Sequence, residues 1–145
     1  MKRSSFVFTL ASLAMLVTAS AVQAAPPSSP FSGTWIGYDL ARDLGGDGST
    51  EHLVVSGGDN ARIDYQDEFG QACWDAGATD FWLSTDLRGT VVGNTMTGSF
   101  KSAKCGHMAL STWKGQPMVW TFNAGATSDP ADDTLFDGVV TWRRV

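Results

Sequence analysis

Short runs of alternating polar and apolar residues follow one another along most of the chain, separated by turns rich in glycine, aspartate and asparagine. In residues 61–66, for example, Ile63 and Tyr65 alternate with polar neighbours. Alternation with a period of two is typical of β-strands that bury one face. The pattern predicts strands at residues 33–40, 52–56, 61–66, 79–85, 89–92, 95–101, 118–124 and 135–144. Beyond residue 24, no stretch shows the spacing of an amphipathic helix.

The predicted strands are joined in sequence by short loops. Gly93-Asn94 is the sharpest hairpin signal, and residues 57–60 form a second turn of glycine, aspartate and asparagine. An open sheet of eight strands would leave two exposed edges, and closure into a barrel removes both. We therefore predict an all-β domain with about eight antiparallel strands in an up-and-down barrel. A sandwich of two sheets is the main alternative.

Residues 1–24 have the features of a secretory signal peptide. Two basic residues precede an apolar run at residues 6–17, and residues 22–24 form a small-residue cleavage site. The apolar run is shorter than the roughly 18 residues of a membrane-spanning helix. No cysteine stands at the cleavage site, so a lipid anchor is not expected. These features predict an exported protein, periplasmic or extracellular, without a membrane anchor.

The remaining chain has the length of one domain. We expect a flexible proline- and serine-rich lead at residues 25–31 and a single barrel domain at residues 32–145. Loss of the signal peptide would remove two of the ten basic residues and none of the fifteen acidic ones, leaving a formal charge of −7. This balance argues against nucleic acids and anionic membrane surfaces as partners, because both are bound through basic patches.

The chain contains two cysteines, Cys73 and Cys105. An even number of cysteines in an exported protein predicts a disulfide, here closing a loop of about 32 residues. A redox pair or a metal site that includes His107 is the alternative. Neither a C-x-x-C spacing nor a third ligand nearby supports it.

The start of the first predicted strand, Gly33-Thr34-Trp35, resembles the G-x-W motif of lipocalins and the wider calycin-type barrels. The resemblance implies that Trp35 plugs one end of the barrel. It also implies that a late arginine, Arg143 or Arg144, lies across the Trp35 ring in a cation–π contact. The same start is similar to that of avidin-type barrels, our second choice. Residues 36–38 replace the polar biotin contacts of the avidin pattern.

Candidate catalytic groups are few. The chain has two histidines, His52 and His107, and no nucleophile motif such as G-x-S-x-G. Asp64 could enter the barrel only if the strand register were reversed. The acidic residues near residues 39–51 and 129–133 do not follow a calcium-loop spacing. We therefore assign no catalytic residue, no metal and no cofactor.

Six tryptophans are more than a small barrel needs for filling, and aromatic side chains commonly line small-ligand pockets. The expected pocket wall comes from aromatic residues in or beside the strands: Tyr65, Trp82, Trp120 and Phe122. Trp74 and Trp113 lie in loops next to the two cysteines, so the disulfide is expected to bring them together at one mouth of the barrel.

Three functions follow from these patterns. The first is a lipocalin-like barrel that binds a small, largely apolar molecule. The second is an interaction module, such as an inhibitor of a secreted or periplasmic enzyme, that uses loops at one end of a filled barrel. The third is a small barrel enzyme with His52, His107 or Asp64 in a polar cavity. An open cavity would favour the first, and a filled core would favour the second.

Overall fold

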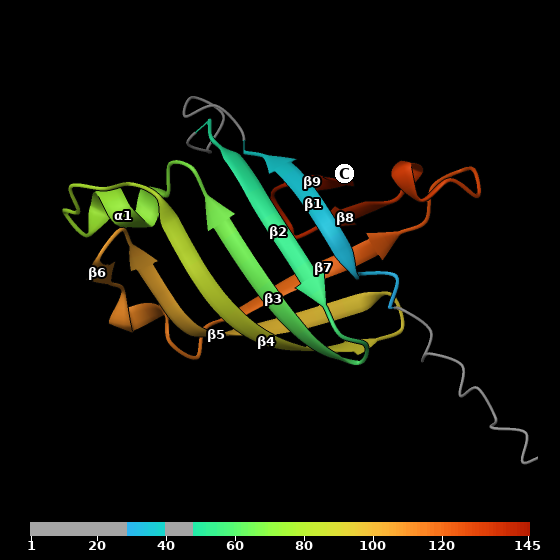
Figure 1. The fold of residues 1–145 in the computed structure, drawn as a ribbon, viewed down its shortest axis with the longest axis horizontal. Coiled ribbons are helices and arrows are strands. Elements are labelled where there is room, and N and C mark those ends of the chain that lie inside the picture. The colour runs from blue at the N-terminus through green and yellow to red at the C-terminus, as the bar shows by residue number, and fades with distance from the viewer. Residues whose placement is uncertain (1–28, 40–47) are drawn as a thin grey trace, which may run out of the picture.

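A computed structural model describes residues 29–39 and 48–145 (Figure 1). The predicted signal peptide, most of the predicted lead and residues 40–47 lie outside the described residues. The elements are β1 (Gly33–Tyr38), β2 (Thr50–Ser56), β3 (Asn60–Asp67), α1 (Gln71–Asp75), β4 (Leu83–Val92), β5 (Thr95–Cys105), β6 (Met108–Ala109), β7 (Pro117–Asn123), β8 (Thr134–Phe136) and β9 (Thr141–Arg144). Short 3-10 helices occupy Ser111–Trp113 and Pro130–Asp132. Within the described ranges, no helix is long and apolar enough to cross a membrane.

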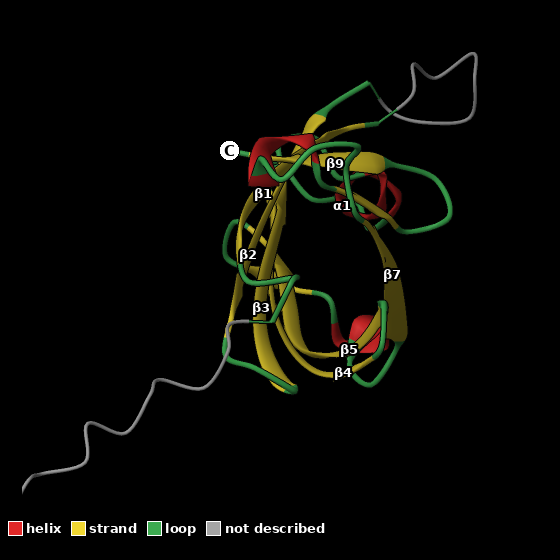
Figure 2. Cartoon of the chain, turned by 90° about the vertical axis from the view of Figure 1, so that its right-hand side faces the viewer, coloured by secondary structure: helices red, strands yellow, loops and turns green. Residues whose placement is uncertain are grey.

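The fold is a closed antiparallel barrel of eight strands, as predicted. Leaving aside the two-residue β6, each strand pairs with the next one along the chain, and β9 pairs with β1. In Figure 2 the strands surround a common centre, with β2 and β3 on one side and β7 on the other. This closed ring is consistent with a calycin-like barrel and excludes the two-sheet sandwich.

Three local predictions were wrong. Residues 79–82 belong to the connection between α1 and β4 and not to a strand. The two strands predicted at residues 79–85 and 89–92 are one strand, β4, which continues to Val92 because a register shift between Asp86 and Leu87 accommodates the break in alternation. The last predicted strand divides into β8 and β9 around a turn that contains Gly138, whose φ of 102° suits glycine. Helix α1 was not predicted, because five residues are too few to show a helical period.

The barrel interior is filled by side chains. Alternate residues of each long strand point inward, so that in β3 Ala61, Ile63 and Tyr65 are buried while their neighbours are more exposed. Trp35, Trp120 and Trp142 have no exposed surface. Their large rings occupy the space that an open barrel would leave for a ligand.

Antiparallel register defines the two ends of the barrel. The Trp35 end contains the start of β1, the β2–β3 turn and the β4–β5 hairpin. The disulfide end contains α1, the start of β4 and the end of β5. Figure 1 shows α1 and β6 at the left of the molecule and the β2–β3 turn at the lower right.

Candidate functional site

The Trp35 end is closed by an arginine. The guanidinium carbon of Arg144 lies 4.1 Å from the centroid of the Trp35 ring. Arg144 Nη1 donates to the carbonyl of Ser32 at 2.5 Å, and Nη2 donates to that of Pro30 at 2.7 Å. Of the two arginines proposed to cover Trp35, Arg144 makes the contact, and Arg143 is exposed. Because side chains alternate along β9, only one of the two can reach the barrel end.

Gly33 makes room for this arginine. Its φ is 138°, and a Cβ at this position would lie 2.6 Å from Arg144 Nη1. The motif glycine therefore serves the packing of Arg144 as well as the backbone conformation of β1.

The four residues expected to line a pocket have different surroundings. Trp120 is fully buried in the core, Tyr65 is 6% exposed, and Phe122 is partly buried with its ring 5.8 Å from that of Phe31. Trp82 differs from expectation, because it lies outside the barrel wall, is 42% exposed and stacks on His52 at 6.3 Å between ring centroids. The next residue, Leu83, points inward, so Trp82 points outward.

The predicted disulfide is present. Cys73 in α1 and Cys105 at the end of β5 are bonded, with their Cα atoms 5.6 Å apart. The two loop tryptophans, expected together at one mouth, pack against different aromatic rings. Trp113 packs edge-on against Phe100 with ring centroids 4.9 Å apart, whereas Trp74 contacts Phe69 and Phe81.

Phe69, Trp74 and Phe81 form an aromatic cluster beside the disulfide. The ring centroids of Phe69 and Phe81 are 4.9 Å apart, those of Trp74 and Phe81 5.3 Å, and those of Phe69 and Trp74 6.4 Å. Trp74 is 53% exposed, and the other two rings are half-buried. A contiguous cluster of aromatic rings with one exposed tryptophan is typical of an interaction surface.

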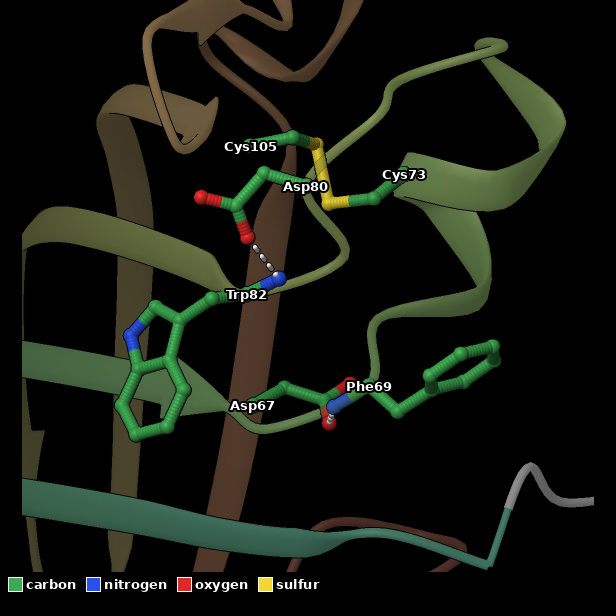
Figure 3. Close-up of a disulfide and its surroundings, with 6 residues drawn as sticks. All are labelled: Asp67, Phe69, Cys73, Asp80, Trp82 and Cys105. Carbon is green, nitrogen blue, oxygen red and sulfur yellow. Dashed lines mark hydrogen bonds between the residues drawn. A yellow bond between two sulfur atoms is a disulfide. The ribbon is translucent and has the colours of Figure 1, made fainter.

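Backbone contacts hold the aromatic cluster in place. The amide of Phe69 donates to Asp67 Oδ1 at 3.0 Å, and the amide of Gly70 donates to the carbonyl of Phe81 at 2.9 Å. Figure 3 shows the disulfide above these segments, with Trp82 and Phe69 pointing to different sides of the connection. Trp82 is therefore not part of the aromatic cluster.

The exposed side chains next to the aromatic cluster in sequence are acidic. Glu68 precedes the segment, Asp75 ends α1 and Asp80 precedes Phe81, and all are accessible to solvent. Asp75 accepts a hydrogen bond from Gln71 at 2.7 Å, and Glu68 Oε1 lies 3.1 Å from His52 Nε2. Asp75 and Asp80 are thus direct sequence neighbours of Trp74 and Phe81, whereas Glu68 is paired with His52 on the Trp82 side.

Sequence reasoning missed a polar group inside the disulfide end. Glu51 and Asp67 are cross-strand partners that point inward, with exposures of only 6% and 5%. The Tyr65 hydroxyl donates to Glu51 Oε1 at 3.2 Å, and Ser49 donates to Asp67 Oδ1 at 2.5 Å. Glu51 Oε2 has no hydrogen-bond partner among the described residues. The alternation of Leu53 and Val55 could have placed Glu51 inward, two positions before them.

Burial raises the pKa of Glu51 from its ordinary value of 4.5 to about 8. The negative charges of Asp67 and Asp137 act in the same direction, and the hydrogen bond from Tyr65 opposes them. Burial, followed by the charge of Glu51, also raises the pKa of the Tyr65 hydroxyl well above its ordinary value. At neutral pH, Glu51 is therefore mainly a neutral carboxyl.

The candidate catalytic groups do not converge. His52 and Asp64 lie on the outer face of the barrel, and His107 is exposed beyond the end of β5. Among residues 29–39 and 48–145, no group of three histidine, cysteine or acidic side chains is arranged to hold a metal ion. The polar cavity required by the small-enzyme hypothesis is therefore not formed by these three residues.

Comparison with protein-family models, with curated proteins and with solved structures finds no match to this chain.

Proposed function

We propose that this protein is an exported interaction module that binds a protein partner through the aromatic cluster at its disulfide end. The observation that carries the proposal is the exposure of Trp74 within a three-ring cluster on a fixed segment. Export rests on the predicted signal peptide at residues 1–24.

The filled core supports binding at the surface rather than inside. Trp35, Trp120 and Trp142 occupy the barrel interior, so a ligand there would have to displace core side chains. A surface held by a disulfide loses little conformational freedom when it binds. Exposed tryptophans are also among the residues that contribute most to protein–protein affinity.

Acidic residues beside the aromatic cluster indicate the chemistry of the partner. Asp75 follows Trp74 and Asp80 precedes Phe81 in the sequence, and the chain carries fifteen acidic against ten basic residues. A complementary partner therefore presents an apolar recess bordered by lysine or arginine. A secreted or periplasmic enzyme with such a recess near its active site would be inhibited by occupation of that recess.

The test measures binding to an identified partner. The purified, immobilised protein is used to isolate basic proteins from the periplasm or the culture medium, and each is then titrated individually. Trp74→Ala should weaken binding by about 30-fold or more, in line with a loss of about 2 kcal/mol. Trp82→Ala is the matched control, since it removes an exposed tryptophan outside the aromatic cluster and should leave affinity unchanged. Equal affinities of the wild type and Trp74→Ala would refute the proposal.

A lipocalin-like carrier of a small apolar molecule is the second candidate. The placement of Arg144 over Trp35, next to Gly33, favours it, because this is the arrangement that the resemblance implies. Titration with fatty acids and retinoids, followed by tryptophan fluorescence, tests it. Saturable quenching of tryptophan fluorescence that persists in Trp74→Ala would support the carrier function. No change in fluorescence with any of these ligands would contradict the carrier function and favour the interaction module.

A further inference from the structure

A furrow crosses the outer face of β3, β4, β5 and the start of β7, toward the Trp35 end and away from the aromatic cluster. It encloses a volume of about 710 Å³. Its floor is formed by three cross-strand neighbours, Ala61 on β3, Gly89 on β4 and Gly98 on β5. In Figure 1 this is the region where β3, β4 and β5 run side by side toward the β2–β3 turn.

The two glycines of the floor are required by close packing against the core. A Cβ at Gly89 would lie 2.8 Å from the Thr97 carbonyl oxygen and 2.9 Å from Ile63 Cδ1. A Cβ at Gly98 would lie 3.1 Å from the Trp120 ring. Both positions face the core, as does Ala61, so the outer face of the sheet at this level consists largely of backbone.

One wall of the furrow is positively charged. Arg62 and Arg88 are directly opposite each other on β3 and β4, and both are exposed. Like charges in this position repel each other across the strands. Asp86 Oδ1 lies 3.4 Å from Arg88 Nη1, whereas Arg62 makes no salt bridge with any described residue. In a chain with an excess of acidic residues, this pair marks a local site for an anion.

The opposite wall carries neutral hydrogen-bonding groups: Asn60, Thr90 and Thr97. Amide and hydroxyl side chains both donate and accept hydrogen bonds. Among the described residues that line the furrow, none is aromatic. A peptide cannot add as a strand here either, because β3, β4 and β5 are each paired on both sides.

We propose that this furrow binds an anionic saccharide chain. Arg62 and Arg88 hold a carboxylate or sulfate group of the saccharide, and the amide and hydroxyl side chains of the other wall bind its hydroxyl groups. Three strand spacings give the furrow a span of about 14 Å, which suits an oligosaccharide of a few residues. This site is separate from the aromatic cluster, so either proposal can fail without the other.

The test is calorimetric titration of the purified protein at low ionic strength. The probes are a galacturonate hexasaccharide, a sulfated heparin hexasaccharide and neutral maltohexaose, and the first two distinguish carboxylate from sulfate. We expect binding of at least one anionic hexasaccharide, weakening as salt is added, and no binding of maltohexaose. Absence of binding by both anionic probes would overturn the proposal.

Paired charge variants locate the site. Arg62→Gln together with Arg88→Gln should weaken the binding at least tenfold. Lys114→Gln together with Arg143→Gln removes the same amount of exposed charge elsewhere and should leave it within twofold. Thermal unfolding verifies that both variants remain folded. An equal loss in the two variants, or equally tight binding of hexaglutamate, would show non-specific charge attraction and overturn the proposal.

Discussion

The two ends of the barrel are closed by different chemistry. At the Trp35 end, an apolar ring lies under Arg144, which donates to two backbone carbonyls. At the disulfide end, Glu51 and Asp67 point into the barrel, and Glu51 Oε2 lacks a partner among the described residues. The same strands therefore run from an apolar plug to a buried polar group.

This difference separates the stabilising plug from the aromatic cluster proposed to bind a protein partner. The Trp35 end contributes packing and offers few exposed aromatic groups. The disulfide end includes a carboxyl whose burial is costly, and it carries the aromatic cluster, of which the exposed Trp74 lies on the short helix α1. Stability–function trade-offs of this kind are common at binding sites.

The largest effect is expected from removing the plug. Trp35→Ala should lower the free energy of unfolding by about 3–5 kcal/mol, because it leaves a cavity in a filled core. Urea denaturation followed by circular dichroism measures this change. Trp82→Ala is the control, because its ring is largely outside the core, and it should cost less than about 1 kcal/mol. Similar losses in both variants would mean that Trp35 does not close the barrel.

Breaking the disulfide should destabilise the opposite end. Replacing both Cys73 and Cys105 with alanine removes a cross-link between residues 32 positions apart. The expected loss is about 3–4 kcal/mol in the chain-entropy model. Partner binding through Trp74 should weaken as well, because α1 is no longer tied to β5. Reduction of the wild type with dithiothreitol should reproduce the loss, and an unchanged denaturation midpoint would contradict it.

Glu51 should make stability depend on pH. Its pKa is about 8 in the folded state against an ordinary value of 4.5, so the folded state binds more protons between these values. The free energy of unfolding should therefore fall as the pH rises through this window. Glu51→Gln should abolish this fall. At pH 9 it should raise the free energy of unfolding above that of the wild type by on the order of 2 kcal/mol. This is less than the whole pKa shift implies, because relaxation of the barrel end offsets part of the cost of burying the charge.

The control for this pH effect is Glu68→Gln, which removes an exposed carboxylate at the same end. Chemical denaturation at several pH values between 5 and 9 compares the two variants with the wild type. A parallel pH dependence in the wild type and Glu51→Gln would show that another group is responsible.

The smallest effect is expected at the arginine that covers the plug. Arg144→Lys retains the charge but loses the planar guanidinium that stacks on Trp35 and reaches two carbonyls. We expect a loss of about 1–2 kcal/mol. Arg143→Lys, at the neighbouring exposed position, should change stability by less than about 0.5 kcal/mol. Differential scanning calorimetry can compare them, and equal shifts would exclude a special role for Arg144.

The fold was predictable because its signals are local. Alternation in residues 61–66 and the Gly93-Asn94 turn each indicate neighbouring antiparallel strands, and closure follows from the need to protect sheet edges. The contact of Trp35 with a late arginine also followed from the resemblance. The alternation left open which face of each strand points inward, and the structure resolves this in β3 by burying Tyr65 and exposing Asp64.

The candidate sites were less predictable because they depend on distant pairings. Phe69, Trp74 and Phe81 meet only after the chain reverses around α1, and the short segment before Leu83 has no alternation that would orient Trp82. The furrow likewise depends on which residue of β3 faces which residue of β4. The spacing placed the loop tryptophans beside the two cysteines in sequence, but their contacts could not be derived from spacing alone.

Ring closure also constrains the order of events during synthesis. β1 finds its second neighbour only in β9, and Arg144 reaches a carbonyl 112 positions earlier in the chain. A chain arrested before Thr141 would leave the edges of β1 and β8 unpaired, where other strands could add to them. Contacts of such long sequence separation also slow folding.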